Sequence, residues 1–264
     1  MGRTFMPSFK NLDELRQHQL NGLQWTVNHA YRGSSHYREK LAAAGVRSTD
    51  IRTLDDIRKL PFTTTDDLRK DYPFPLLSVP ESRVVRVHAS SGSTGKRKIL
   101  SYTQKDIDDW IHFFARCYEM AGIAAADRVQ IAVGYGIWTA GVGFQLGCEK
   151  FGAMALPVGP GNIDLQCQFL VDLQSTVMCC TASMGLLMAE EINRRNLKDK
   201  IALKKMIFGS ERSSDAMRTR IKDLLGLEDM FDIPGMTELY GPGTGLDFPR
   251  HEGIHYWADY YILE

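Results

Sequence analysis

The sequence predicts an α/β protein in which mostly parallel sheets are flanked by helices and preceded by a helical segment. Two observations carry this prediction. From about residue 82 onward, short apolar segments alternate with amphipathic helical patterns, which is typical of parallel strands joined by right-handed crossovers. The first 80 residues instead show leucines at helical spacing, interrupted by prolines. We therefore expect two parts, with a boundary between residues 80 and 81.

The helical segment, residues 1–80, has recognisable helix boundaries. Asn11 is the expected N-cap of the first helix, with Glu14 as its partner in a capping box. Glycine or proline follows two of the later helical patterns and is expected to end them. Further helices are predicted over residues 35–44, 54–60 and 65–70.

The α/β part, residues 81–264, alternates between two periodicities. Strands are predicted over residues 82–89, 129–133, 154–157, 176–181, 205–208 and 230–233. Helices are predicted over residues 104–121, 140–151, 163–173, 184–194 and 215–225. Residues 254–263 are expected to form a strand or hairpin arm with nothing after it to pair with. This pattern predicts that the domain is truncated at its C-terminal end.

Composition excludes several classes of protein. The 264 residues are 44% hydrophobic, and Lys plus Arg equal Asp plus Glu in number, so no overall charge attracts nucleic acid or an anionic membrane. No secretory signal and no apolar stretch of about 20 residues is visible. The five cysteines lack CxxC spacing and are expected to be buried, reduced thiols. We therefore expect a cytoplasmic protein with no nucleic-acid or membrane partner.

The most informative segment is HASSGSTGKRK, residues 88–98, which follows a predicted strand. Its glycines permit a positive φ, successive backbone N–H groups in such a turn can surround an anion, and Lys96 adds charge. These features suit a polyphosphate, and an exposed polar linker is the alternative. A Walker A loop is excluded because Ser90 and Arg97 stand where it needs Gly and Ser or Thr.

Residues 90–98 resemble the phosphate-binding signature of the adenylate-forming superfamily, with Arg97 in place of the usual proline. Residues 232–238, DIPGMTE, are similar to the Tyr-Gly-x-Thr-Glu signature of the same superfamily, with Pro234 where an aromatic residue is usual. Further segments narrow the resemblance to the phenylacetate–CoA ligase family, namely residues 60–80, 133–162, 208–211, 239–243 and 253–264. Coenzyme F390 synthetases, which transfer AMP to a deazaflavin, share most of these segments.

This resemblance implies an acyl-CoA synthetase-like N-terminal domain without its C-terminal lid. The implied activity is ATP-dependent conversion of an aryl carboxylic acid to acyl-AMP and then to an acyl-CoA thioester, with ATP, Mg²⁺ and coenzyme A as cofactors. Lys96, Thr237 and Glu238 would be catalytic, with Glu238 binding the metal. The implied ATP-binding residues are Ser90, Ser91, Gly92, Ser93, Thr94, Gly95, Lys96, Gly209, Ser210, Glu211, Asp232, Pro234, Gly235, Met236 and Thr237. The expected acyl-binding residues are Tyr135, Gly136, Ile137 and Trp138, with plain core packing as the alternative.

Two other functions stay open, which are AMP transfer to a deazaflavin and a non-catalytic ATP-binding module. The family's ribose-binding aspartate, hinge and lid lysine cannot be placed in the 264 residues, so we expect this polypeptide alone to bind ATP weakly and to form little acyl-AMP. An apolar edge near residues 254–263 favours a homodimer. His251 and His255 are four residues apart, but Pro249 and Gly253 disfavour a helix, so zinc is not expected. His88 is expected to pack in the core.

Overall fold

The computed structural model describes residues 4–70, 72–74, 76–90 and 96–264. The chain forms two compact units. The sheet unit comprises residues 1–6 and 106–256, and the helical unit comprises residues 7–105 and 257–264. The end of the chain joins the helical unit because His18 Nε2 lies 3.0 Å from the Asp259 carbonyl oxygen, and the Gln19 side chain donates to the Ala258 carbonyl at 2.8 Å.

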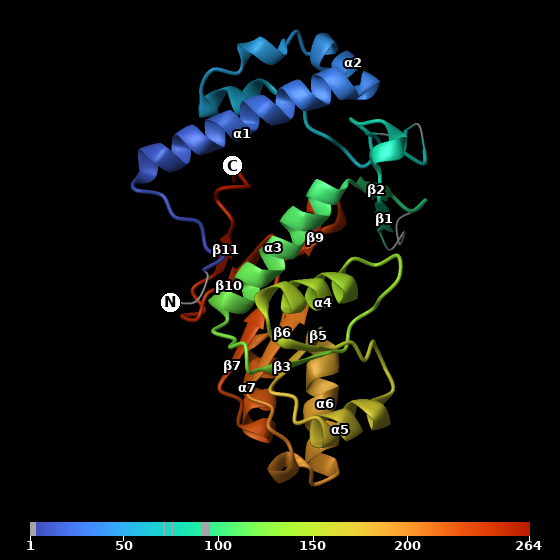
Figure 1. Ribbon diagram of the computed structural model, residues 1–264, viewed down its shortest axis with the longest axis vertical. Coiled ribbons are helices and arrows are strands. Elements are labelled where there is room, and N and C mark those ends of the chain that lie inside the picture. The colour runs from blue at the N-terminus through green and yellow to red at the C-terminus, as the bar shows by residue number, and fades with distance from the viewer. Residues whose placement is uncertain (1–3, 71, 75, 91–95) are drawn as a thin grey trace. The chain divides into compact units, whose positions relative to one another are not determined.

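A five-stranded parallel sheet forms the centre of the sheet unit, with strand order β4-β3-β5-β6-β7 (Figure 1). Its strands are β3 (Arg128–Ile131), β4 (Met154–Leu156), β5 (Val177–Thr181), β6 (Lys205–Gly209) and β7 (Asp229–Asp232). The helices are α3 (Gln104–Met120), α4 (Ala140–Phe151), α5 (Ile163–Asp172), α6 (Ala182–Arg194) and α7 (Asp215–Leu225). The predicted α/β class with parallel strands is confirmed.

Helices cover both faces of this sheet, which explains why its strands are almost continuously apolar. On β5, Met178 and Cys180 belong to the core that α5, α6 and α7 share with the sheet. Cys179 points to the other face, where its sulfur lies 3.8 Å from the hydroxyl of Tyr118 on α3. On that face α3 and α4 pack closely, because a Cβ atom at Gly147 would lie 2.1 Å from Phe114 Cβ.

Two short antiparallel pairs follow β7. Strand β8 (Gly235–Met236) pairs with β9 (Gly241–Pro242), and β10 (Gly245–Asp247) pairs with β11 (Ile254–Tyr256). The expected arm over residues 254–263 is therefore shorter than predicted. Its partner, β10, precedes it in the sequence.

The helical unit is built on α1 (Leu12–Gly33) and α2 (Ser35–Ala43). Asn11 caps α1 by accepting the Glu14 N–H at 2.9 Å, as predicted. The Glu14 carboxylate, however, accepts the Lys10 N–H rather than that of Asn11. Residues 54–59 form a 3₁₀ helix, and residues 65–70 form turns instead of the predicted helix. The Asp67 carboxylate fixes these turns by accepting from Thr64 and Lys40.

A two-stranded hairpin in the helical unit carries the predicted phosphate loop. Strand β1 (Arg86–Ala89) pairs antiparallel with β2 (Ile99–Tyr102). The sequence predicts only the first of these strands, because β2 is short and lies directly after the basic residues of the loop. His88 is buried, and its ring meets that of Tyr102 edge-on at 5.2 Å between centroids, which confirms its predicted packing role.

All five cysteines are buried free thiols, as predicted. Burial raises the pKa of each of them, and for Cys148 it raises the pKa to about 12, so these thiols are poor nucleophiles. Among the helices that the structure describes, none combines the length and the apolar character needed to cross a bilayer.

Candidate functional site

The carboxyl edge of the parallel sheet gathers several of the predicted ATP-binding residues. Thr181 at the end of β5 lies opposite Gly209 at the end of β6, and Asp232 at the end of β7 lies opposite Phe208. The loops after β6 and β7 therefore leave the sheet side by side, at the edge where open α/β sheets bind ligands. The structure thus brings the 209–211 turn and the 232–238 segment to one edge of one unit.

The turn after β6 is held to the start of helix α6. Ser210 adopts a left-handed conformation, with φ of 70°, which turns the chain sharply after Gly209. The Glu211 carboxylate then accepts the Ser183 N–H at 2.6 Å. Hydrogen bonds from the Ser183 side chain and backbone, together with one from Thr181, lower the pKa of Glu211. Glu211 is therefore an ionised acceptor at the α6 N-terminus, a role that the sequence does not predict.

The Thr237–Glu238 turn is held by close backbone packing. Residues 237–239 form a 3₁₀ turn between β8 and β9. A Cβ atom at Gly235 would lie 2.3 Å from the Gly241 carbonyl oxygen, so only glycine allows the two strands to approach this closely. The Pro234 carbonyl accepts the Gly243 N–H at 3.0 Å. Half-buried side chains at 237 and 238 are thus presented from a fixed backbone.

The predicted acyl-binding turn follows β3. The Tyr135 ring lies against Gly141 at the start of α4, where a Cβ atom would be 2.7 Å from Tyr135 Cδ2. Within the described part of the chain, the Tyr135 hydroxyl is buried and has no hydrogen-bond partner. Burial raises the pKa of Tyr135 well above its usual value, so the hydroxyl is a neutral donor. Ile137 and Trp138 are partly exposed.

The acyl-binding turn and the Thr237–Glu238 turn meet in the sheet unit. Thr139, which follows Trp138 directly, is buried, and a Cβ atom at Gly241 would lie 2.8 Å from Thr139 Cβ. The Trp110 indole donates to the Pro242 carbonyl at 3.1 Å and fastens the same turn to α3. Two groups of residues predicted to bind different substrates are therefore neighbours.

The predicted phosphate loop connects β1 and β2 in the helical unit. Ser91, Gly92, Ser93, Thr94 and Gly95 lie outside the described residues. Ser90 closes the hairpin twice, because its N–H donates to the Lys98 carbonyl and its hydroxyl accepts the Lys98 N–H, both at 3.0 Å. The Lys96 ammonium lies over the Tyr72 ring, 3.4 Å from its centroid. That the loop binds phosphate stays a prediction.

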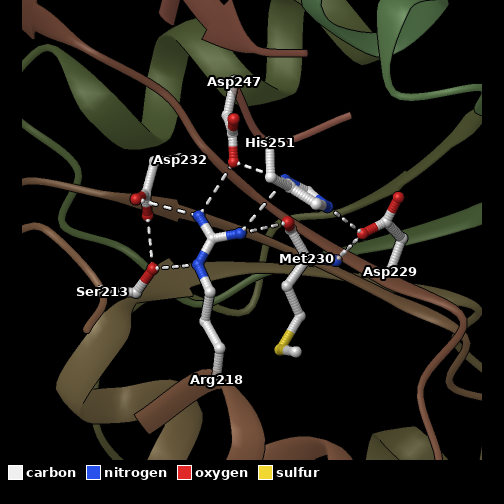
Figure 2. A network of polar contacts seen from close by, with 7 residues as sticks. All are labelled: Ser213, Arg218, Asp229, Met230, Asp232, Asp247 and His251. Atoms are coloured by element: carbon white, nitrogen blue, oxygen red, sulfur yellow. Dashed lines mark hydrogen bonds and ion pairs between the residues drawn. The ribbon is translucent and has the colours of Figure 1, made fainter. Parts of the chain in front are cut away.

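Next to the carboxyl edge lies a polar network centred on Arg218 of α7 (Figure 2). Its Nε donates to the Ser213 hydroxyl at 2.7 Å, and its Nη1 donates to the Met230 carbonyl at 2.9 Å. Its Nη2 lies 2.9 Å from the Asp232 carboxylate and 3.0 Å from that of Asp247. The Asp232 carboxylate also accepts the Ser213 hydroxyl at 2.9 Å. One guanidinium therefore connects α7, β7, β10 and the loop after β6.

His251 completes the network from the β10–β11 turn. Its ring nitrogens lie 2.8 Å from the carboxylates of Asp247 and Asp229. Partial burial disfavours the charged ring, but the two carboxylates outweigh that effect and raise the pKa of His251. His255 points elsewhere and packs edge-on against Phe248, at 4.8 Å between ring centroids. Within residues 4–264 as described, no group of three or more His, Cys, Asp or Glu side chains is arranged to hold a metal ion.

The sequence indicates two carboxylates of this network but does not identify Arg218 as their partner. Asp229 and Asp232 flank the apolar pair Met230-Phe231, and carboxylates at the ends of a buried strand need cationic or hydrogen-bonding partners. The sequence contains 32 lysines and arginines, however, and nothing in the local pattern selects Arg218. A similar signal is Gln130 within an apolar strand, whose amide pairs with buried Gln166 at 2.6 Å.

Comparisons with known proteins agree with this geometry. The chain is 40% identical over 257 residues to the phenylacetate–coenzyme A ligase of Escherichia coli K12, and 38% identical over 256 residues to that of Pseudomonas putida. It is 33% identical over 264 residues to the enzyme of Thermus thermophilus. The chain is thus similar in sequence to phenylacetate–coenzyme A ligases along nearly its whole length. It spans about three fifths of the length of these relatives, 58–59%, while they match 96–98% of the chain.

Solved structures support the fold of the chain. An open conformation of 2-hydroxyisobutyryl-CoA ligase, in complex with 2-HIB-AMP and CoA, matches with a TM-score of 0.86 at 23% identity, covering 94% of this chain and 60% of that one. An anthranilate CoA ligase in complex with anthranoyl-AMP matches with a TM-score of 0.52 at 18% identity, covering 78% and 37% of the two chains. No family model matches the sequence.

Proposed function

We propose that the chain is the ATP- and acid-binding part of an enzyme that activates an aryl carboxylic acid as its coenzyme A thioester. The observation that carries this proposal is the 33–40% identity to phenylacetate–coenzyme A ligases along nearly the whole chain. The geometry of the sheet unit supports it, because the turns assigned to the nucleotide and to the acid are neighbours at the carboxyl edge of the sheet.

The proposed reaction has two steps. A carboxylate oxygen of the acid attacks the α-phosphorus of ATP, forming an acyl–phosphate bond while the bond to pyrophosphate breaks. The thiolate of coenzyme A then attacks the acyl carbonyl, and AMP leaves. Neither step needs a nucleophile from the protein. The chain's contribution is to hold an anion against a polyanion, so positioning and charge neutralisation provide the catalysis.

Both segments that resemble the superfamily signatures are proposed to bind ATP. Ser90, Lys96 and the loop between them would hold the β- and γ-phosphates, while Thr237 would contact the α-phosphate. Lys96 suits this role because it is exposed, and because its ammonium contacts the neutral ring of Tyr72 and keeps its positive charge available to a phosphate. Gly209, Ser210, Glu211, Asp232, Pro234, Gly235 and Met236 are proposed to line the nucleoside side.

Glu238 is proposed to contribute a carboxylate oxygen to Mg²⁺. Its place on the 3₁₀ turn beside Thr237 suits a metal that bridges phosphates. Mg²⁺ prefers oxygen ligands and commonly keeps several waters, taking only one or two protein carboxylates in addition to nucleotide phosphates. One carboxylate fits that pattern, and the described residues hold no larger cluster of candidate ligands. When bound, the metal would neutralise charge on the phosphates, and Glu238 would fix its position.

Tyr135, Gly136, Ile137 and Trp138 are proposed to contact the aryl acid. The raised pKa of Tyr135 keeps its hydroxyl protonated, so it can donate a hydrogen bond but bears no charge that would repel a carboxylate. Partly exposed Ile137 and Trp138 offer apolar surface beside it. This combination of an apolar surface and one placed donor favours a small aromatic acid.

An acid-dependent isotope exchange between pyrophosphate and ATP tests this function. Because this polypeptide alone is expected to form little acyl-AMP, we expect slow exchange, and that exchange should require phenylacetate or a related aryl acid together with Mg²⁺. A thermal-shift panel of ATP, coenzyme A, aryl acids and a deazaflavin identifies ligands independently of turnover, because a ligand at 100 times its Kd adds about 2.7 kcal/mol to the free energy of unfolding. A shift with the deazaflavin and none with any aryl acid would replace the proposal by AMP transfer to a deazaflavin.

A further inference from the structure

The Arg218 network connects two turns that the proposed function assigns to the nucleotide. Ser213 lies two residues after Glu211, and Asp232 lies two residues before Pro234. The Asp232 carboxylate accepts from Ser213 through Oδ1 and pairs with Arg218 through Oδ2, and Arg218 in turn donates to Ser213 (Figure 2). These three side chains form a closed triangle, so neither turn can shift without breaking a hydrogen bond to the other.

Arginine is the side chain that this geometry needs. Its guanidinium carries five donors in a fixed plane, and here it contacts five partners: one hydroxyl, one backbone carbonyl, two carboxylates and, at 3.4 Å, a ring nitrogen of His251. A lysine ammonium, a compact point charge, cannot reach these separated partners together. The side chains of Arg218, Asp232 and Asp247 are only 17%, 18% and 8% exposed, so each unpaired carboxylate would be left in a poorly solvated position.

The Arg218 network contains more negative than positive charge, so its stability depends on the Arg218 guanidinium. Asp229, Asp232 and Asp247 contribute three negative charges, whereas Arg218 contributes one positive charge and His251 a second when it is protonated. Without Arg218, the carboxylates at the end of β7 and on β10 would repel one another. The turns after β6 and β7 would then lose their common anchor.

We propose that Arg218 is a positioning residue for nucleotide binding, which couples the 209–213 turn to the 232–238 turn without touching the ligand. This inference rests on the proposed function, because it takes both turns to line the nucleotide. It assigns a role in the reaction to a residue outside both signature segments.

Arg218→Met, Arg218→Lys and the matched control Arg220→Met provide the test. Arg220 lies on the same helix, its side chain is 58% exposed, and it lies 4.0 Å from the Glu190 carboxylate. Each variant is measured by ATP·Mg²⁺ affinity and by amide hydrogen exchange of residues 209–214 and 232–239, with the melting temperature recorded separately. We expect Arg218→Met to speed exchange in both segments together and to weaken ATP binding about tenfold, a loss of about 1.4 kcal/mol. Arg218→Lys should restore little of either, and Arg220→Met should match the wild type.

A lowered melting temperature with unchanged exchange in residues 232–239 and unchanged ATP affinity would overturn the inference and leave Arg218 a purely structural residue. Exchange that rises in only one segment would overturn it too, because the coupling would be absent. Should Arg218→Met not fold, Arg218→Lys and Asp247→Asn give the same comparison. If the wild-type chain does not bind ATP at all, the proposed function is contradicted instead. Amide hydrogen exchange in the Arg218 variants still decides whether Arg218 couples the two turns.

Discussion

The two segments that resemble a nucleotide-binding signature are supported very differently. The Thr237–Glu238 turn belongs to the sheet unit, where Gly235 packs against backbone, Trp110 binds the Pro242 carbonyl, and Arg218 anchors the preceding strand. The loop with Ser90 and Lys96 belongs to the helical unit and ends a hairpin of two four-residue strands. Two-stranded hairpins gain stability from what packs on them, and here His88 and Tyr102 provide part of that packing.

This contrast indicates a division of roles. Substitutions of the closely packed glycines in the 235–242 turn should act mainly through the fold, because the neighbouring backbone leaves no space for a side chain. Substitutions of exposed residues at the loop should act mainly on ligand affinity, because their side chains are not part of a core. Measurements of stability and of ATP affinity on the same variants therefore test this division of roles.

The largest effect is expected from Gly235→Ala. The new methyl group would lie 2.3 Å from both the Gly241 carbonyl oxygen and Pro242 Cα, and backbone cannot move aside as a flexible side chain can. We expect a loss of about 3 kcal/mol in the free energy of unfolding, at the upper end for overpacked sites, measured by urea denaturation. Gly22→Ala is the control, because α1 has open space there, and it should stabilise the chain by about 0.5–1 kcal/mol. Equal stability of the Gly235 variant and the wild type would show that the backbone around this turn is not rigidly packed.

Lys96→Ala should show the opposite behaviour. The exposed ammonium contacts the Tyr72 ring, and its loss should leave the melting temperature within experimental error. ATP affinity should fall about tenfold, equivalent to about 1.4 kcal/mol, when measured by calorimetric titration. Lys150→Ala on α4 removes an exposed lysine from the sheet unit and should change neither quantity. A Lys96 variant that binds ATP as tightly as the Lys150 variant would contradict the phosphate assignment.

Glu211→Ala should produce a smaller loss, of about 1 kcal/mol, typical for removal of an acceptor at a helix N-terminus. The folded-state pKa of Glu211 is lowered, so its contribution is present above its unfolded pKa of 4.5 and is lost as the pH falls through the folded value. The denaturation curves of variant and wild type should therefore differ at pH 7, and the difference between them should shrink at pH 3. Glu190→Ala, an exposed position on α6, should show no such pH dependence; a parallel loss there would implicate surface charge in general.

The smallest effect is expected from His251→Gln. The folded pKa of His251 is raised above 6.5, so its stabilising contribution is complete below that value and is lost as the pH rises through the folded pKa. The groups that face the ring are Asp247, Asp229 and Arg218. The ring is partly exposed, so solvent screening should limit the difference to about 0.5 kcal/mol at pH 5.5. A difference that grows towards pH 8.5 would show that the ring acts as a neutral acceptor.

Much of the sheet unit could be predicted from local pattern alone. Buried strands such as Val177–Thr181 are apolar along their whole length because helices cover both faces, and Gly152 marks the end of α4 through its left-handed conformation. The β1–β2 pairing was not predictable in the same way. Strand β2 spans four residues and pairs across a loop of polar and basic residues, so its periodicity is too short to distinguish it from the loop.

The candidate site shows the same limit. The residues of the 232–238 segment stand out because they are contiguous in sequence. Arg218 and Asp247, in contrast, are 29 residues apart and meet only in the folded chain. The role of Glu211 at the start of α6 likewise depends on the register between β5 and β6, which the sequence does not specify. Contiguous signatures are therefore predictable, while the side chains that hold them in place are found only in the structure.

The most direct test of the account is a calorimetric titration of ATP·Mg²⁺ into the wild-type chain, Lys96→Ala and Glu238→Gln under the same conditions. If Lys96 and Glu238 both contribute to nucleotide binding, the wild type binds at a single site, and each substitution alone weakens that binding about tenfold without lowering the melting temperature. Full ATP affinity in both variants, or no binding of ATP by the wild type, would contradict the account.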